Sequence, residues 1–384
     1  MKILLISTSS GSRGGGELWL RYLGRGLRDL GHKVGLWCSH HPQMNELADQ
    51  FSEVGEVIRG EYVNTYHRRL RSFAHLFPSP RASKAKDAWV AWGADAILLN
   101  KQNLEDGLDL LQQLDGAAPK VACMIHITQS AKYLGARHAW IRDRAAAWLL
   151  RGFRGAIVTA PIDRACELSE FLSGRKVEAI NNGVPEPDMD YLSRCGANLR
   201  RKYGFDQDEL IFLGLGRLEP QKAPLEFVRR AVQISKEDSR ARFVWVGDGR
   251  MRAEFEAATQ ASGIREKFLV AGWQSEVQPW LGLADALIHT AIYEGMPFAV
   301  LEALSAGLPC FVESGLLDEI SPFRASGIIE MDEQSHWLNY VAKRSLLEEA
   351  RLGAKDLFLR EFSITQMCQK YALLFGANQN PRQP

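Results

Sequence analysis

The sequence lacks the cysteine patterns that are typical of disulfide-stapled or zinc-binding chains. Its six cysteines are scattered over 384 residues, with no C-x-x-C pair and no histidine nearby at metal-ligand spacing. No apolar run approaches the length of about 18 residues needed to cross a bilayer, and the opening MKILLIS is too short for a secretion signal. These absences predict reduced cysteines and a cytoplasmic location.

A large net charge of either sign is also missing. The net charge is +1, and 46% of the residues are hydrophobic and 24% charged, the proportions of an ordinary globular protein. The charge is unevenly placed, since residues 1–183 carry +6 and the remainder carries −5. The first half of the chain is therefore its basic half.

Apolar runs rich in Ile, Val and Leu alternate with helical patterns, which indicates parallel sheets buried on both faces. The alternation stops at a stretch rich in Pro and Asp and starts again near residue 210. The predicted fold class is α/β, with two Rossmann-like domains facing across a cleft. The predicted boundaries are 1–184 for the first domain, 185–198 for a linker, 199–361 for the second domain and 362–377 for a C-terminal helix returning toward the first.

A glycine-rich stretch, GSRGGGELW, follows the first predicted strand and raises the question of a nucleotide loop. It lacks the G-x-G-x-x-G spacing, and no acidic residue ends a clear second strand, so a nicotinamide site is not expected. Gly14, Gly15 and Gly16 permit a close backbone approach, although they are also compatible with a simple turn.

The most informative segment is HTAIYEGMPFAVLEALSAGLP, in which seven residues separate Glu294 from Glu302. Pro297 suits the first turn of a helix, which puts Glu294 just before the helix and Glu302 inside it. We expect the amides of Phe298, Ala299 and Val300 to point outward, where a diphosphate is favoured by unpaired N–H groups and the helix dipole. The two carboxylates would accept hydrogen bonds from sugar or ribose hydroxyls.

A second segment, GLGRLEPQKAP, follows the first strand of the second domain and carries Arg217 and Lys222. Two cations in one loop can neutralise a departing diphosphate, Arg through its planar fork and Lys as a point charge. Both residues are also compatible with an ordinary exposed loop. Their place directly after a strand favours the binding role.

With these motifs in hand, the chain resembles the retaining glycosyltransferases of family 4, also called glycosyl transferases group 1, which have the GT-B fold. The resemblance covers essentially the whole chain. It is carried by GGGELW near the start, INNGV at 180–184, GRLEPQKAP at 216–224, VGDG at 246–249, EGMPFAVLE at 294–302 and ALSAGLP at 303–309.

The resemblance implies a role for each matching residue. Glu294 would contact the donor sugar, Glu302 the ribose, and Arg217 with Lys222 the donor diphosphate. His126, at a strand end in CMIHIT, matches a histidine beside the donor sugar, although it is also compatible with a core histidine. The implied donor-binding set is Gly15, Gly16, Gly216, Arg217, Lys222, Gly247, Gly249, Glu294, Gly295, Met296, Pro297, Phe298, Ala299, Val300 and Glu302, of which Arg217, Lys222 and Glu294, together with His126, form the catalytic set.

The chain departs from the family pattern at two places. Ala223 follows the motif lysine where the family usually has Gly, and the segment before the last conserved Glu is thinned to SGLLDEI, which leaves Gly315 and Glu319. Two D-x-D strings, Asp188 to Asp190 and Asp206 to Asp208, lie in predicted linker and turn segments, so we interpret them as surface acids. No metal site and no cofactor are expected.

The implied reaction transfers a sugar from a nucleoside-diphosphate donor to a glycan or lipid-linked acceptor, with retained anomeric configuration, in bacterial polysaccharide or glycolipid biosynthesis such as that of lipopolysaccharide. The leaving phosphate would accept the acceptor proton on the front face. A non-hydrolysing nucleotide-sugar epimerase and a non-catalytic nucleotide-sugar-binding subunit remain alternatives. No nucleic-acid partner is expected.

The basic half contains a segment, AKYLGARHAWIRDRAAAWLLRGFRG, on which Arg137, Trp140, Arg144, Trp148 and Arg151 recur at helical spacing. A stripe of Arg and Trp suits a lipid headgroup region, and a second cluster contributes Arg68, Arg69, Arg71, Phe73, Phe77, Arg81, Lys84 and Lys86. The sequence therefore predicts peripheral association with the inner face of the cytoplasmic membrane through the first domain. A Trp148 buried on the sheet and a phosphorylated soluble acceptor are the alternatives.

Overall fold

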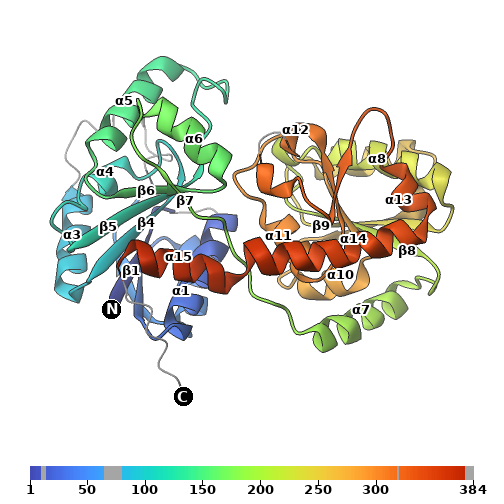
Figure 1. Ribbon diagram of the computed structural model, residues 1–384, viewed down its shortest axis with the longest axis horizontal. Helices are drawn as coiled ribbons and strands as arrows, with labels where there is room; N and C mark the ends of the chain where they lie inside the picture. The colour runs from blue at the N-terminus through green and yellow to red at the C-terminus, as the bar shows by residue number, and fades with distance from the viewer. Residues whose placement is uncertain (10–13, 65–79, 318–319, 377–384) are drawn as a thin grey trace. The chain divides into compact units, whose positions relative to one another are not determined.

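The computed structural model describes residues 1–9, 14–64, 80–317 and 320–376 (Figure 1). The chain divides into two units, the first made of Met1–Gly183 with Ile364–Pro384 and the second of Val184–Ser363. Each unit is an α/β domain on a parallel sheet, which confirms the prediction of two α/β domains with parallel sheets. Arg68, Arg69, Arg71, Phe73 and Phe77 of the second basic cluster lie outside the described residues, as does Glu319.

The sheet of the first unit has seven parallel strands in the order β3-β2-β1-β4-β5-β6-β7. They are β1 (Lys2–Ser7), β2 (Lys33–Ser39), β3 (Glu56–Gly60), β4 (Ala96–Asn103), β5 (Lys120–Ile127), β6 (Ala156–Thr159) and β7 (Glu178–Ala179). Strand β1 pairs with β2 on one side and with β4 on the other, so the order of the strands reverses there. In open α/β sheets such a reversal leaves a crevice at the carboxyl ends of the two strands, where ligands bind.

The sheet of the second unit has six parallel strands in the order β10-β9-β8-β11-β12-β13. They are β8 (Leu210–Leu215), β9 (Ala241–Val246), β10 (Phe268–Gly272), β11 (Ala286–His289), β12 (Cys310–Glu313) and β13 (Ile328–Met331). The reversal lies between β8 and β11, which pair through Ala286 with Phe212 and Leu287 with Leu213. Any residue that follows β8 or β11 directly is therefore brought to one crevice.

Helices connect the strands in both units. The first unit has α1 (Gly15–Asp29), η1 (Pro42–Met44), α2 (Asn45–Ser52), α3 (Pro80–Trp92), α4 (Leu108–Leu111), α5 (Ala139–Gly152), α6 (Ile162–Phe171) and α15 (Ile364–Leu374). The second has α7 (Met189–Tyr203), η4 (Pro220–Lys222), α8 (Pro224–Glu237), α9 (Arg252–Ala261), η5 (Arg265–Lys267), α10 (Gln278–Leu283), α11 (Phe298–Ser305), α12 (Ser314–Leu317), η6 (Ser321–Phe323), α13 (Leu338–Ala342), α14 (Arg344–Leu357) and a π-helical turn η7 (Phe358–Phe362).

The central strands are apolar along their whole length because helices cover both faces of each sheet. Ile211, Phe212 and Leu213 of β8 have no exposed surface, and neither have Ile3 to Ile6 of β1. Strands β3 and β13 were not predicted from the sequence, since each contains solvent-exposed residues and neither forms a long apolar run. Both lie at an edge of their sheet.

The C-terminal helix α15 packs in the first unit, as predicted, beside α1 (Figure 1). Tyr371 is fully buried and meets the ring of Trp19 edge-on, with 5.6 Å between ring centroids. A Cβ atom on Gly26 of α1 would lie 2.3 Å from the Sγ atom of Cys368. A glycine at this position is therefore what allows the two helices to approach.

Helix α7 begins inside the segment 185–198 that the sequence predicts to be a linker. Asp188 caps its N-terminus by accepting a hydrogen bond from the Tyr191 amide at 3.0 Å, which is how an aspartate starts a helix after a proline-rich stretch. A Cβ atom on Gly196 would lie 2.1 Å from the Gly282 carbonyl oxygen, so α7 packs directly on α10. The segment belongs to the second unit.

Ala223, the departure from the family pattern noted above, adopts a left-handed backbone with φ 43° and ψ 56°. It lies at the N-cap of α8, between Lys222 and Pro224. An L-residue with a Cβ atom is strained there, whereas glycine is not. We expect Ala223→Gly to raise the free energy of unfolding by about 0.5–1 kcal/mol, measured by urea unfolding.

Gly204 provides the matched control. It caps the C-terminus of α7 with φ 70°, and nothing lies within 4 Å of a Cβ atom built on it. Gly204→Ala therefore adds strain without a clash and should lower the stability by about 1 kcal/mol. A lower free energy of unfolding for Ala223→Gly than for the native chain would contradict the claim that the Cβ atom of Ala223 strains the backbone.

Candidate functional site

The crevice of the second unit brings together two of the sequence-predicted residues. Lys222 ends η4, which follows β8, and Glu294 lies in the loop that follows β11. The Lys222 ammonium forms an ion pair with Oε1 of Glu294. Glu294 has only 9% of its surface exposed, so a carboxylate and its counter-ion are held almost out of water.

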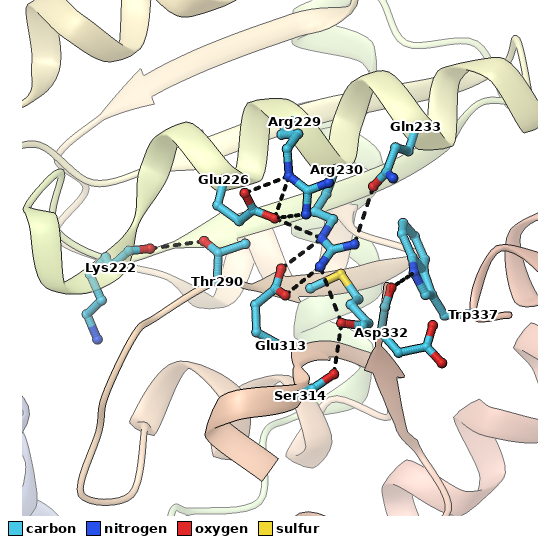
Figure 2. Close-up of polar contacts among 11 residues, drawn as sticks. Lys222, Glu226, Arg229, Arg230, Gln233, Thr290, Glu313, Ser314, Asp332 and Trp337 are labelled. Atoms are coloured by element: carbon cyan, nitrogen blue, oxygen red, sulfur yellow. Dashed lines mark hydrogen bonds and ion pairs between the residues drawn. The ribbon is translucent and has the colours of Figure 1, made fainter. Parts of the chain in front are cut away.

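Backbone hydrogen bonds fix the two loops against each other. The Ile292 amide donates to the Gln221 carbonyl at 2.9 Å, and the Gln221 side-chain amide donates to the Tyr293 carbonyl at 3.0 Å. The Thr290 hydroxyl donates to the Lys222 carbonyl at 2.9 Å, while the Lys222 ammonium points the other way (Figure 2). The Lys222 side chain can thus change partner without any movement of its backbone.

His289, the last residue of β11, was not singled out from the sequence. It is 3% exposed, and its Nε2 atom lies 3.8 Å from Oε1 of Glu294. Burial, and secondly the charge of Lys222, hold the pKa of this imidazole well below its usual range. His289 is therefore neutral at physiological pH.

The predicted glycines of the second unit form one tight backbone crossing. A Cβ atom on Gly247 would lie 2.0 Å from the Gly216 carbonyl oxygen, and one on Gly249 would lie 2.4 Å from the Leu218 carbonyl oxygen. Gly216 and Gly247 have φ angles of 151° and 129°. The crossing follows β8 and leaves the Arg217 side chain exposed, with no hydrogen bond or ion pair in the part of the chain that the structure describes.

Helix α11 differs in one detail from the prediction. Pro297 is its N-cap residue, and its carbonyl accepts hydrogen bonds from the amides of Val300 at 3.1 Å and Leu301 at 3.2 Å. The Val300 amide, predicted to point outward, is therefore used within the first turn. Gly295, Met296 and Pro297 are buried, Phe298 and Ala299 are partly exposed, and Glu302 lies half-buried on the helix as predicted.

A network of charged groups that the sequence did not indicate holds α8 to the ends of β12 and β13 (Figure 2). Arg230 is 4% exposed and donates to both carboxylate oxygens of Glu313, at 2.8 and 2.6 Å. It also lies 3.0 Å from Glu226 and over the Trp337 ring. Because α8 starts two residues after Lys222, this network holds in place the helix into which the Lys222 loop leads.

In the first unit, Gly15 and Gly16 are the first residues of α1, and Gly16 packs tightly against Gln102. The Asn100 side chain links this turn to His126. Asn100 donates to the Gly16 carbonyl at 3.2 Å, and its Oδ1 atom lies 2.6 Å from Nε2 of His126. Trp19 meets the His126 ring edge-on at 5.2 Å. His126 and the two glycines thus meet in the first unit, while the other predicted residues lie in the second.

Burial lowers the pKa of His126 to about 4. The imidazole is therefore neutral at physiological pH and, with Asn100 oriented as described, donates through Nε2. Asn100 was missed because the sequence does not show which strands are neighbours. The pairing of Ser7 with Asn100 is what places this side chain beside α1.

Glu17, in the first turn of α1, was also missed. Its Oε1 atom accepts a hydrogen bond from the Ser9 hydroxyl and one from Gln102 at 3.5 Å, while its Oε2 atom is buried with no hydrogen-bond partner in the described chain. Burial raises its pKa from the ordinary 4.5 to about 7, the Asp106 charge adds to the rise, and the hydrogen bond from Ser9 opposes it. The Glu17 carboxyl, at the crevice of the first sheet, is therefore partly protonated near neutral pH.

One aspartate of each D-x-D string has a local structural contact. Asp188 caps α7, and the Asp206 amide donates to the Glu209 carboxylate at 3.0 Å within a turn. Within the described residues, no group of three or more His, Cys, Asp or Glu side chains is arranged to hold a metal ion. All six cysteines are free thiols.

Helix α5 presents most of the predicted stripe to solvent. Trp140 is 69% exposed and Trp148 is 65% exposed, so Trp148 is not buried on the sheet. Arg144 and Arg151 are exposed on the same helix, whereas Arg137 precedes it because His138 is the N-cap residue. Among the described helices, none is long and apolar enough to cross a membrane.

Part of the chain is similar to a known family and to several curated proteins. Residues 197–321 match the model of the family described as glycosyl transferases group 1. Over 39% of its length, the chain is 30% identical to 39% of the UDP-Gal:alpha-D-GlcNAc-diphosphoundecaprenol alpha-1,3-galactosyltransferase of Escherichia coli. Over 37% of its length, it is 28% identical to 27% of the Vi polysaccharide biosynthesis protein VipC/TviE of Salmonella typhi. The chain thus matches less than half the length of these relatives.

The solved structures match over nearly the whole chain. Anabaena Alr3699/HepE, solved in complex with UDP, superposes with a TM-score of 0.77 over 98% of this chain and 100% of that one, at 17% identity. The sucrose-phosphate synthase of Thermosynechococcus elongatus superposes with a TM-score of 0.73 over the same shares, at 18% identity. Two parallel-sheet α/β units of this kind are the GT-B fold.

The raised pKa of Glu17 predicts a pH-dependent stability. Between pH 4.5 and about 7 the folded chain holds a proton on Glu17 that the unfolded chain has lost, so this residue's contribution to stability falls as pH rises through that window. Glu17→Gln cannot ionise. The free energy of unfolding of Glu17→Gln minus that of the native chain should therefore be about 1–3 kcal/mol larger at pH 8 than at pH 5, measured by urea unfolding.

The exposed Glu53, at the end of α2, supplies the control, because Glu53→Gln removes a carboxylate that is in water in both states. Its effect on stability should be the same at both pH values. If Glu17→Gln also shifts the stability equally at pH 5 and pH 8, the carboxyl is not protonated in the folded chain.

Proposed function

We propose that the chain transfers a sugar from a nucleoside-diphosphate donor to a glycan or lipid-linked acceptor. The proposal starts from the match of residues 197–321 to the glycosyl transferases group 1 model. The transfer retains the anomeric configuration and needs neither metal nor cofactor. The observation that carries this proposal is the Lys222–Glu294 pair at the crevice between β8 and β11. An ammonium and a buried carboxylate side by side suit a ligand that has a diphosphate next to sugar hydroxyls.

Each group has one task in this reaction. Lys222 and the exposed Arg217 neutralise the charge that develops on the leaving diphosphate, and Glu294 accepts hydrogen bonds from the donor sugar. Glu302 on α11 binds the ribose. The leaving phosphate itself takes the acceptor proton on the front face of the sugar, so no protein nucleophile is needed. His126, neutral and donating to Asn100 through Nε2, has its Nδ1 atom left to accept a hydrogen bond from a hydroxyl of the transferred sugar.

The acceptor, in this proposal, is lipid-linked, and the first unit works at the inner face of the cytoplasmic membrane in polysaccharide or glycolipid biosynthesis. The exposed indoles of Trp140 and Trp148 suit the boundary between headgroups and acyl chains, and Arg144 and Arg151 suit anionic headgroups. The E. coli relative acts, by its name, on an acceptor attached to diphosphoundecaprenol.

The donor site is tested by Arg217→Ala and Lys222→Ala. The donor is first identified by thermal shift with UDP-, GDP- and ADP-sugars, since only a bound nucleotide stabilises the chain. We expect each variant to lower turnover about 100-fold, because each removes a charge that stabilises the transition state. Arg194→Ala, an exposed arginine on α7, is the matched control and should leave turnover unchanged.

The same assay, run with EDTA and with or without acceptor, separates the alternatives. Native turnover in Arg217→Ala or Lys222→Ala would remove the donor site from this loop. Activity that EDTA abolishes and Mg²⁺ or Mn²⁺ restores would overturn metal independence. A product that forms without any acceptor would indicate an epimerase.

The membrane proposal is tested by co-sedimentation with vesicles of neutral lipid or of neutral lipid mixed with anionic lipid. Binding should need the anionic lipid, weaken with salt, and fall at least about tenfold when Trp140, Trp148, Arg144 and Arg151 become Ser, since each cation near the surface contributes roughly 1 kcal/mol. Arg194→Ser with Lys202→Ser, on α7, is the charge control. Equal recovery in the supernatant with both vesicles at low salt would favour a soluble acceptor.

A further inference from the structure

The proposed reaction leaves one buried polar group at the donor site without a task. His289 ends β11 with 3% of its surface exposed, and its Nε2 atom is buried with no hydrogen-bond partner in the described chain. Buried polar atoms are nearly always paired, so an unpaired one needs a reason. Oε1 of Glu294 lies 3.8 Å from this atom, which is just beyond hydrogen-bond distance.

Oε1 of Glu294 is at present occupied by the Lys222 ammonium. A diphosphate at this crevice would compete for the same ammonium, because it carries more negative charge than a carboxylate. The hydrogen bonds among Gln221, Ile292 and Tyr293, and between Thr290 and Lys222, hold both loops in place, so the exchange is a rotation of the lysine side chain alone.

That exchange would leave the Glu294 carboxylate, only 9% exposed, without its counter-charge. An unpaired buried carboxylate is strongly disfavoured, so the side chain would either take up a proton or turn away from the sugar. Either change would remove the acceptor that the donor sugar needs. A second hydrogen-bond donor that is already in place would prevent both.

We propose that His289 is a positioning residue for Glu294, whose Nε2–H donates to Oε1 when Lys222 turns to the donor diphosphate. This inference rests on the proposed function for the identity of the diphosphate, although the pairing itself belongs to the chain. A neutral imidazole is suited to the task because it can hold the carboxylate without bringing a second cation that would compete for the phosphate.

The pairing is tested without any ligand by Lys222→Met, which removes the ammonium as diphosphate binding would. In the native background, His289→Leu should lower the unfolding temperature only slightly, because Nε2 has no partner to lose. In the Lys222→Met background, the same change should lower it by about 3 °C or more beyond the sum of the single effects. His289→Gln, which keeps a donor, should recover most of that loss.

Two-bond ¹H–¹⁵N correlation spectra report which ring nitrogen of each histidine is protonated. If His289 only packs in the core, this signal should not change in Lys222→Met. The His289 signal is the one missing in His289→Gln. In Lys222→Met its Nε2 should be protonated and hydrogen-bonded, and its pKa should rise, because the Lys222 cation is gone and Glu294 is paired with the ring; Lys222 and Glu294 are the charged groups that face it. Additive unfolding temperatures, or an unprotonated Nε2 in Lys222→Met, would overturn the proposal.

Turnover then separates this inference from the proposed function. With the donor identified by thermal shift, His289→Leu should lower kcat about tenfold with an unchanged affinity for the nucleoside diphosphate, and His289→Gln should restore it. Equal turnover in the native chain and His289→Leu would overturn the positioning role even if transfer is confirmed. If the pairing is found and no nucleoside diphosphate binds, the proposed function fails and the role of His289 is limited to Glu294.

Discussion

The arrangement of the second unit depends on an ammonium and a carboxylate held together with little access to water. Lys222 and Glu294 are far apart in sequence, and they meet because β8 and β11 are neighbours at the point where the strand order reverses. Hydrogen bonds from Gln221 and Thr290 hold the two loops together, and Arg230 anchors the helix that follows Lys222. In the proposed function, a ligand that has both phosphate and hydroxyl groups would satisfy both charges of this pair.

The same strand order gives the first unit a crevice of a different chemical character. The groups there are a neutral histidine held by an amide, and a carboxyl that holds its proton close to pH 7. No cation takes part in the hydrogen bonds described for His126 or Glu17. Under the proposed function, such a surface would recognise its ligand by hydrogen bonds and shape, whereas the crevice of the second unit would recognise it by charge. One topology would then support two kinds of recognition.

The sequence was informative where the proposed site residues lie at a short spacing from one another. The seven residues between Glu294 and Glu302, and the four between Arg217 and Lys222, can each be counted within one short segment, and the fold class follows from the alternation of apolar runs. His289, Asn100 and Glu17 could not be found in this way, because their importance comes from neighbours on other strands. The edge strands β3 and β13 escaped because partly exposed strands lack a long apolar run, and α7 escaped because its Asp188 cap resembles a linker acid.

Helix α15 has a consequence for the order in which the chain takes shape during synthesis. It completes the first unit, yet the ribosome makes it only after the whole of the second unit. Until then Trp19, Leu23 and Gly26 of α1 lack the residues that pack against them, Tyr371 and Cys368. The second unit is contiguous and has all its strands by residue 331. The nascent chain therefore holds a finished C-terminal unit while its N-terminal unit still waits for its last helix.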